Sequence, residues 1–251
     1  MPPRGIKMVL KKLCPVKLVG RGEHRGFQSL RQGIKLRGLT KRLQAKLFSN
    51  GSLPSIAKHG SERRCGWDGQ FGGMRRGTAV DSQISRAINS GNILPQKKQY
   101  VLTKLALIAL HNHGLVPIVA QRGCCAEQFK IATAADIVCY ECSTGRVVVV
   151  ELKCGHSGSK TACAQINGEP CKMNSPVSSA CDNVLNRHMA QLAVTRELIA
   201  RETDTISKLN DLGVASEIGA NLLYVNNDGT ELFSLPEWWL KRAPKILSAL
   251  Q

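Results

Sequence analysis

Two carboxylates and a lysine near the middle of the chain have types and spacing that suit metal-assisted hydrolysis. Residues 134–155 read AADIVCYECSTGRVVVVELKCG, in which Asp136 starts one β-rich run and Glu151 and Lys153 close the next. Glu151 and Lys153 are two residues apart, so their side chains leave a strand on the same face. Two neighbouring carboxylates repel each other unless a cation sits between them, and their oxygens suit Mg²⁺ or Mn²⁺. A lysine beside them can orient or activate a water for attack on a phosphodiester, so the pattern favours a nuclease site.

The two β-rich runs predict the hairpin that would bring these side chains together. DIVCYE and RVVVVEL flank the turn sequence CSTG, which is typical of an antiparallel hairpin. In such a hairpin the start of the first strand lies opposite the end of the second, so Asp136 should lie close to Glu151. Four consecutive valines at 147–150 predict a strand buried on both faces at the centre of a sheet. The ordinary alternative for Glu151 and Lys153 is a solvated ion pair, which contributes little stability.

The pattern around the hairpin predicts a mixed α/β domain. We expect helices at four segments, most of them marked by apolar residues at three-to-four spacing: 78–91, 98–114, 183–201 and 236–250. A strand is expected at 115–121, where Pro117 indicates a sheet edge or a strand start. A second hairpin is expected where 221–226 and 231–235 flank the turn sequence NDG. This order of elements predicts a central mixed sheet flanked by helices.

Positive charge is concentrated in the first hundred residues. The chain of 251 residues has a net charge of +17; residues 1–100 contain 21 basic and 4 acidic residues, and residues 101–251 contain 14 of each. Such a block is typical of contact with a polyanion, because neutralising phosphates releases counterions. We therefore expect a nucleic acid as the partner, and together with the nuclease site we expect DNA, held through its phosphates without reading of its sequence. A solvated basic tail and an organelle transit peptide are alternatives for the same charge.

Composition divides the chain near residue 74. Residues 1–74 are expected to be a basic N-terminal extension that ends in a Gly- and Ser-rich linker at 49–74, and residues 75–251 to be the α/β domain. No apolar run approaches the roughly 20 residues that span a bilayer, and the first residues lack the apolar stretch of a secretory signal. We expect no membrane partner. We also expect an intracellular protein of the nucleus, a virion or an organelle, with its ten cysteines as free thiols.

The segment ATAADIVCYECSTGRVVVVELK resembles the PD-(D/E)xK nuclease superfamily, with Asp136 as the motif aspartate and ELK at 151–153 as the E-x-K. RGTAVDSQI at 76–84 is similar to the Gly-Thr-x-x-His helix start of the RecB-like and λ-exonuclease-like branch. RHMAQLAVTREL at 187–198 is similar to the downstream helix of that branch, which carries a glutamine. A small basic herpesvirus core family with the same motif is a second relative by this pattern. The likeness covers about residues 75–240 and implies a restriction-endonuclease-like core with a basic N-terminal extension.

The resemblance implies a role for each matching residue. Asp136 and Glu151 would hold Mg²⁺ (or Mn²⁺) together with the main-chain carbonyl of Leu152. Lys153 would position the attacking water, and Gln191 would face the site from its helix to support Lys153 or the substrate. The implied activity is that of a Mg-dependent deoxyribonuclease, an exonuclease or an endonuclease, in which a Mg-bound water attacks the phosphodiester.

The chain departs from the family pattern at three places. Asp81 stands where many relatives have His or Glu, so it is expected either as a further metal ligand or as a helix-surface residue. Ala135 replaces the motif proline, and Cys154-Gly155 replaces the commoner Thr-Gly after the lysine.

A basic protein of a large RNA–protein assembly stays open from the N-terminal charge alone, and two further alternatives stay open from the sequence. The first is a catalytically silent protein that keeps the nuclease fold for binding DNA or RNA or as a virion or scaffold component. The second concerns the cysteines: Cys139 and Cys142 form a CxxC pair, which with later cysteines would give a structural zinc or iron–sulfur site.

Overall fold

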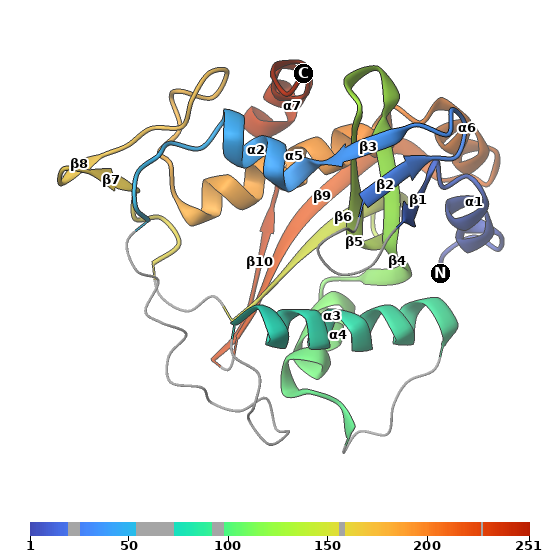
Figure 1. The fold of residues 1–251 in the computed structure, drawn as a ribbon. Coiled ribbons are helices and arrows are strands. Elements are labelled where there is room, and N and C mark those ends of the chain that lie inside the picture. Colours follow the sequence, from blue (N-terminus) through green and yellow to red (C-terminus); the bar gives the residue numbers. More distant parts are fainter. Residues whose placement is uncertain (20–25, 54–72, 92–97, 156–158, 227) are drawn as a thin grey trace.

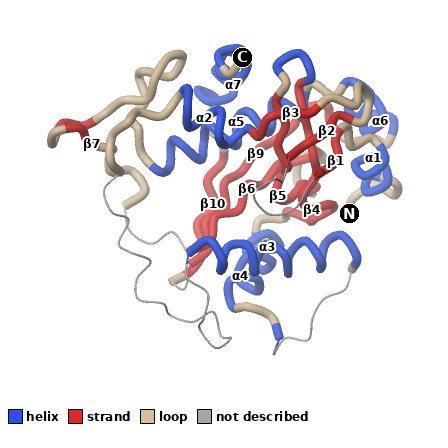
Figure 2. Tube along the Cα trace, in the orientation of Figure 1, coloured by secondary structure: helices blue, strands red, loops and turns tan. Residues whose placement is uncertain are grey.

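An eight-stranded sheet runs through the molecule, with helices on both of its faces (Figures 1 and 2). The computed structural model describes residues 1–19, 26–53, 73–91, 98–155, 159–226 and 228–251. The strand order is β1-β2-β3-β5-β6-β9-β10, and β4 pairs with β5 outside that path. Two pairs, β3–β5 and β6–β9, are parallel and the others are antiparallel. The predicted α/β class with a mixed central sheet and flanking helices is confirmed.

The strands of the sheet are β1 (Val16–Val19), β2 (Gly26–Ser29), β3 (Lys35–Gly38), β4 (Leu115–Ala126), β5 (Ile131–Glu141), β6 (Arg146–Cys154), β9 (Ala215–Asn226) and β10 (Gly229–Ser234). A separate short hairpin is formed by β7 (Gln165–Ile166) and β8 (Glu169–Pro170). Among the described residues the helices are α1 (Ile6–Lys12), α2 (Leu39–Lys46), α3 (Gly73–Ser90), α4 (Val101–Asn112), α5 (Val184–Ala200), α6 (Thr203–Asp211) and α7 (Glu237–Ala249), and η4 (Glu127–Phe129) is a 3₁₀ turn. The four predicted helices correspond to α3, α4, α5 and α7, and both predicted hairpins form.

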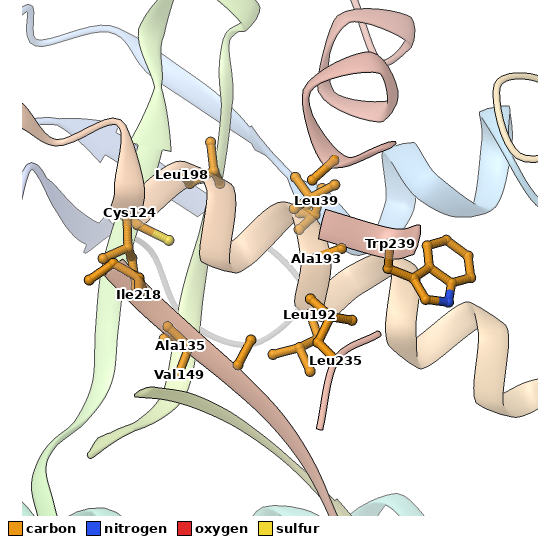
Figure 3. Packing of buried hydrophobic residues seen from close by; sticks show 14 of the residues in the cluster. Leu39, Cys124, Ala135, Val149, Leu192, Ala193, Leu198, Ile218, Leu235 and Trp239 are labelled. Atoms are coloured by element: carbon orange, nitrogen blue, oxygen red, sulfur yellow. The ribbon is translucent and has the colours of Figure 1, made fainter. Parts of the chain in front are cut away.

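The sheet separates two apolar cores. On one face α5 and α7 pack with α1 and α2, and Figure 3 shows Leu192 of α5 in the same cluster as Val149 of β6. On the other face α3 and α4 pack, with Ile84 and Val150 in that second cluster. Because consecutive strand side chains alternate between faces, the valines at 147–150 supply both cores and are at most 1 % exposed. The prediction of a central strand buried on both faces is confirmed.

The basic N-terminal segment extends this sheet. β1, β2 and β3 form an antiparallel meander, and β3 joins β5 in parallel through two residue pairs. Leu10 of α1, Leu39 and Leu43 of α2 and Leu47 directly after α2 are buried in the first core, because their spacing gives each short helix one apolar face. Composition placed residues 1–74 outside the α/β domain, whereas the described residues 1–19 and 26–53 belong to its sheet and its core. Residues 54–72 of the expected linker lie outside the described residues.

An ion pair also fixes the N-terminal segment to the domain. Arg122 of β4 is 2 % exposed, and its guanidinium bonds both carboxylate oxygens of Glu202, at 2.9 and 2.5 Å. It also donates to the main-chain carbonyl of Leu10 at 3.0 Å. The attraction of Glu202 outweighs the cost of burial, which alone would lower the pKa of Arg122, and raises it above its ordinary value. One arginine therefore connects β4, α1 and the start of α6.

The loop between β6 and α5 contains a disulfide. Cys163 and Cys181 are joined by a disulfide, so the expectation of free thiols is wrong for this pair. Their Cα atoms are 5.7 Å apart because the loop between β6 and α5 folds back on itself there. Among the described helices none is long and apolar enough to cross a bilayer.

Candidate active site

The candidate site lies where β5 and β6 separate. Along one edge β5 pairs with β4 over its whole length, and along the other it pairs with β3 at residues 131–132 and with β6 at 137–141. Residues 133–136 have no strand partner on that second edge in these pairings. We call this opening the strand fork. An unpaired strand edge exposes polar main-chain groups, and those groups need other partners.

Asp136 supplies such a partner. Its Oδ2 accepts a hydrogen bond from the main-chain N–H of Leu152, at 2.9 Å. Asp136 therefore continues the pairing of β5 with β6 by a side chain where the two main chains have diverged. This contact places Asp136 beside Glu151 and Lys153, as the hairpin predicted.

Glu151, Lys153 and Gln191 form a closed set of hydrogen bonds next to Asp136. Lys153 Nζ donates to Glu151 Oε1 at 2.6 Å, and Gln191 Nε2 donates to the same oxygen at 2.6 Å. Lys153 Nζ also donates to Gln191 Oε1 at 3.5 Å. Gln191 lies on α5, which packs on the face of β6 from which Glu151 and Lys153 project. The structure thus brings together the four residues proposed from the sequence as catalytic.

Burial changes the protonation of this cluster. Burial and the nearby charge of Asp136 raise the pKa of Glu151 to about 7, against the opposing attraction of Lys153. Burial alone would lower the pKa of Lys153, but the charges of Glu151 and Asp136 outweigh it and raise that pKa. Lys153 is therefore an ammonium ion at neutral pH, which can donate hydrogen bonds and stabilise negative charge but cannot accept a proton.

Gln121 connects the cluster to α3. Its Nε2 donates to Asp81 Oδ1 at 2.9 Å and to Asp136 Oδ1 at 3.3 Å. Gln121 stands opposite Asp136 in the β4–β5 register and has a φ of +54°, a left-handed conformation that costs a residue other than glycine on the order of 1–3 kcal/mol. Asp81, expected as a metal ligand or a helix-surface residue, thus lies beside the site with Gln121 between it and Asp136.

The cluster has donor atoms that suit a small divalent cation. Glu151 Oε2 is buried without a hydrogen-bond partner among the described residues. The N–H and C=O of one strand residue leave on the same edge, so the Leu152 carbonyl faces the strand fork together with the N–H that binds Asp136. Two carboxylates and a carbonyl match the oxygen ligands of Mg²⁺ or Mn²⁺. Among the described residues no group of three or more His, Cys, Asp or Glu side chains is placed to hold a metal, so Asp81 does not complete a three-carboxylate set and the cysteines form no metal cluster.

A recess of about 310 Å³ opens beside Lys153 and Gln191. Residues of α2 and of the segment that follows it line one side, and residues of α5 line the other: Thr40, Leu43, Phe48, Leu53, Val184, Arg187 and His188. Arg187 stacks on the ring of Phe48 at 4.7 Å and donates from Nε to Asp182 Oδ1 at 2.6 Å. Burial would raise the pKa of Asp182, but hydrogen bonds from Arg187 and Ser49 outweigh it and lower that pKa. The recess therefore has a fixed cation and an aromatic ring next to the candidate site.

Sequence reasoning missed the residues that join the site to its surroundings. Gln121 falls in a predicted strand, where a polar residue at a sheet edge carries no signal. Arg187 and His188 belong to the predicted helix of Gln191, and only their distance from that residue, one turn, could have indicated them. Comparison of the chain with models of known protein families and with curated proteins gives no match, so the chemistry of the site rests on its own geometry.

Proposed function

We propose that this protein is a metal-dependent DNA nuclease with a PD-(D/E)xK core. The observation that carries the proposal is the convergence of Asp136, Glu151, Lys153 and Gln191 at the strand fork. Glu151 is a buried carboxylate with a raised pKa, and a second carboxylate and an ammonium ion lie beside it. Catalytic sites gather groups with perturbed pKa values in this way.

Asp136, Glu151 and the Leu152 carbonyl would hold Mg²⁺ or Mn²⁺. When bound, the ion supplies positive charge that polarises the phosphate and acidifies a coordinated water. Glu151 Oε2 has no hydrogen-bond partner among the described residues and supports this assignment, because a buried ionised carboxylate oxygen without a donor is costly unless a cation or a proton meets it. Gln121 keeps Asp136 in place from the other side through its bond to Oδ1.

Lys153 would act on the water and on the phosphate as a hydrogen-bond donor. Its ammonium group is held by Glu151 Oε1 and Gln191 Oε1, which leaves one of its three donors for a water or a phosphate oxygen. Gln191 fixes the relative positions of Glu151 and Lys153, because it bonds both. Attack in line with the leaving oxygen would require a phosphate beside Lys153 and Asp136.

The distribution of charge supports DNA as the substrate. The exposed basic residues among residues 1–19 and 26–53 are Arg4, Lys11, Lys12, Lys17, Arg31, Lys35, Arg37, Lys41 and Lys46, and these two ranges contain no acidic residue. Lys41 and Lys46 belong to α2, the helix that borders the recess beside Lys153. Phosphate contacts from this segment would position the polymer without reading its sequence.

Cleavage of linear and of circular DNA, each with Mg²⁺, Mn²⁺ or EDTA, tests the proposal. Asp136→Asn and Lys153→Ala should abolish metal-dependent cutting, and the matched controls Asp211→Asn and Lys208→Ala, whose side chains are 61 % and 64 % exposed in a surface pair, should cut normally. Equal DNA binding by all five proteins with no cutting by any would refute the nuclease and leave a silent DNA-binding protein.

A further inference from the structure

A buried arginine without an ion-pair partner among the described residues lies at the end of the strand that carries Glu151 and Lys153. Arg76 of α3 is 8 % exposed, and its Nε atom is buried with no hydrogen-bond partner in the part of the chain that the structure describes. An unpaired charge in such a place is costly, because burial removes the water that would solvate it.

The position of Arg76 on its helix makes a buried charge there still less expected. The buried residues of α3 recur every four positions, and Val80, Ile84 and Ile88 place their side chains in the core between α3 and the sheet. Arg76 occupies the first position of the same stripe. A helix that needed only to pack would have an apolar side chain there.

Gly155 provides the space that Arg76 occupies. A Cβ atom built on Gly155 would lie 1.9 Å from Nη2 and 2.8 Å from Cζ of Arg76, so the guanidinium fills the place of a side chain. Gly155 directly follows β6 and has a φ of +75°, which favours glycine independently. Because Gly155 is two residues beyond Lys153, their Cα atoms are about 7 Å apart.

Arg76 approaches the end of β6 from the face opposite to Gln191. α3 belongs to the core on one side of the sheet, and α5 to the core on the other. α3 also carries Asp81, which Gln121 connects to Asp136. Five residues of helix correspond to about 7.5 Å along the axis, so Arg76 lies just beyond the border of the candidate site.

We propose that Arg76 binds a phosphate group of the substrate strand, next to the phosphate that Lys153 faces. The identity of the substrate rests on the proposed function. A guanidinium donates two parallel hydrogen bonds to two phosphate oxygens, and this geometry is stronger and more directional than an ammonium contact. The phosphate oxygens replace the water that the guanidinium of Arg76 loses on burial. Gly155 belongs to the same site, because any side chain there would displace the guanidinium.

The test compares Arg76→Met with wild type and with Lys208→Met, which removes an exposed cation from α6. Binding of a labelled duplex oligonucleotide is measured in EDTA at several salt concentrations, and stability is measured by urea unfolding without ligand. Arg76→Met should bind several-fold more weakly, and its slope of log K against log salt should fall by about one. Lys208→Met should match wild type in both. Arg76→Met should unfold at the same or a higher urea concentration, because Met continues the apolar stripe.

Gly155→Ala is a second variant with the charge retained, and it should lose the same binding. An Arg76→Met protein that unfolds at lower urea and binds DNA like wild type would overturn the proposal, because Arg76 would then have a structural role only. Inorganic phosphate that raises the unfolding midpoint of wild type but not of Arg76→Met, with equal oligonucleotide binding by both, would also overturn it in favour of a small phosphate ligand.

Cleavage of linear DNA with Mg²⁺ by the same proteins separates this inference from the nuclease proposal. If wild type binds DNA through Arg76 but never cuts, the phosphate site stands and the nuclease fails. If wild type and Arg76→Met cut and bind alike, the phosphate site fails alone.

Discussion

Replacement of Glu151 by glutamine should change how the stability of the metal-free protein depends on pH. The pKa of Glu151 rises from 4.5 to about 7 in the folded state, because the side chain is buried beside Asp136. A tenfold change in proton affinity between the unfolded and folded states corresponds to about 1.4 kcal/mol, so the rise in the pKa of Glu151 amounts to about 3 kcal/mol. Glu151→Gln keeps the shape of the side chain and removes its titration.

The sign follows from proton binding in the two states. Between pH 4.5 and about pH 7 the folded protein keeps a proton on Glu151 that the unfolded chain has released, so the free energy of unfolding falls as the pH rises. This contribution is fully present below pH 4.5 and is lost as the pH passes the folded pKa of about 7. Wild type should therefore lose about 3 kcal/mol relative to Glu151→Gln between about pH 4.5 and about pH 8.

Urea unfolding in EDTA at several pH values between about 4.5 and about 8 measures the difference, with Glu217→Gln as the control. Glu217 is a carboxylate whose side chain is 65 % exposed, and its variant should follow wild type at every pH. Mg²⁺ or Mn²⁺ favours the ionised carboxylate, so binding near pH 6 should release a proton from wild type, and calorimetry in buffers of different ionisation enthalpy detects it. Parallel stability curves for wild type and Glu151→Gln would refute the reasoning from burial.

Three further changes test other parts of the structure. Gln121→Gly removes both the left-handed strain and the hydrogen bond to Asp136. We therefore expect a free energy of unfolding within about 1 kcal/mol of wild type and a clear loss of kcat/KM. A large loss of stability with normal cleavage would contradict this. Thr40→Trp places a large side chain at an exposed position that lines the recess, so it should raise KM for an oligonucleotide with little change in kcat. Steady-state kinetics with an unchanged KM would mean that the recess does not receive substrate. Glu202→Ala leaves Arg122 buried without its partner and should lower the free energy of unfolding by about 3 kcal/mol in urea, whereas a loss below about 1 kcal/mol would mean that the remaining bonds of Arg122 suffice.

Local patterns in the sequence were sufficient for much of the fold. The run of valines before Glu151 indicated a central strand because only a strand buried on both faces tolerates it, and the turn residues between the two runs fixed the antiparallel register. The predicted hairpin register alone was sufficient to place Asp136 close to Glu151. Gln191 was found through a resemblance, since nothing in the pattern of α5 distinguishes it from other polar residues of that helix.

The remainder depends on contacts between distant parts of the chain. The strands β1, β2 and β3 have only four residues each, which is too short for a clear alternation, and β1 and β3 contain lysine or arginine. The basic composition of the segment therefore dominated the interpretation. α6 was missed because a single turn separates it from α5. Gln121 became visible only in the structure, through its hydrogen bonds to Asp81 and Asp136 and its left-handed backbone conformation, which no propensity predicts.

Because the N-terminal segment is part of the fold, its proposed role in DNA binding has to be tested by surface substitutions. A deletion of residues 1–50 would remove basic charge, but it would also remove β3 from the edge of β5 and Leu39, Leu43 and Leu47 from the core that α5 shares. Loss of DNA binding in such a deletion would then report unfolding as readily as lost phosphate contacts. Exchange of Lys41 and Lys46 for glutamine alters charge on an exposed face and leaves the buried face of α2 intact. The exposed basic residues of the N-terminal segment and the strand fork therefore belong to one folded unit. Only substitutions confined to exposed side chains can separate an effect on binding from an effect on folding.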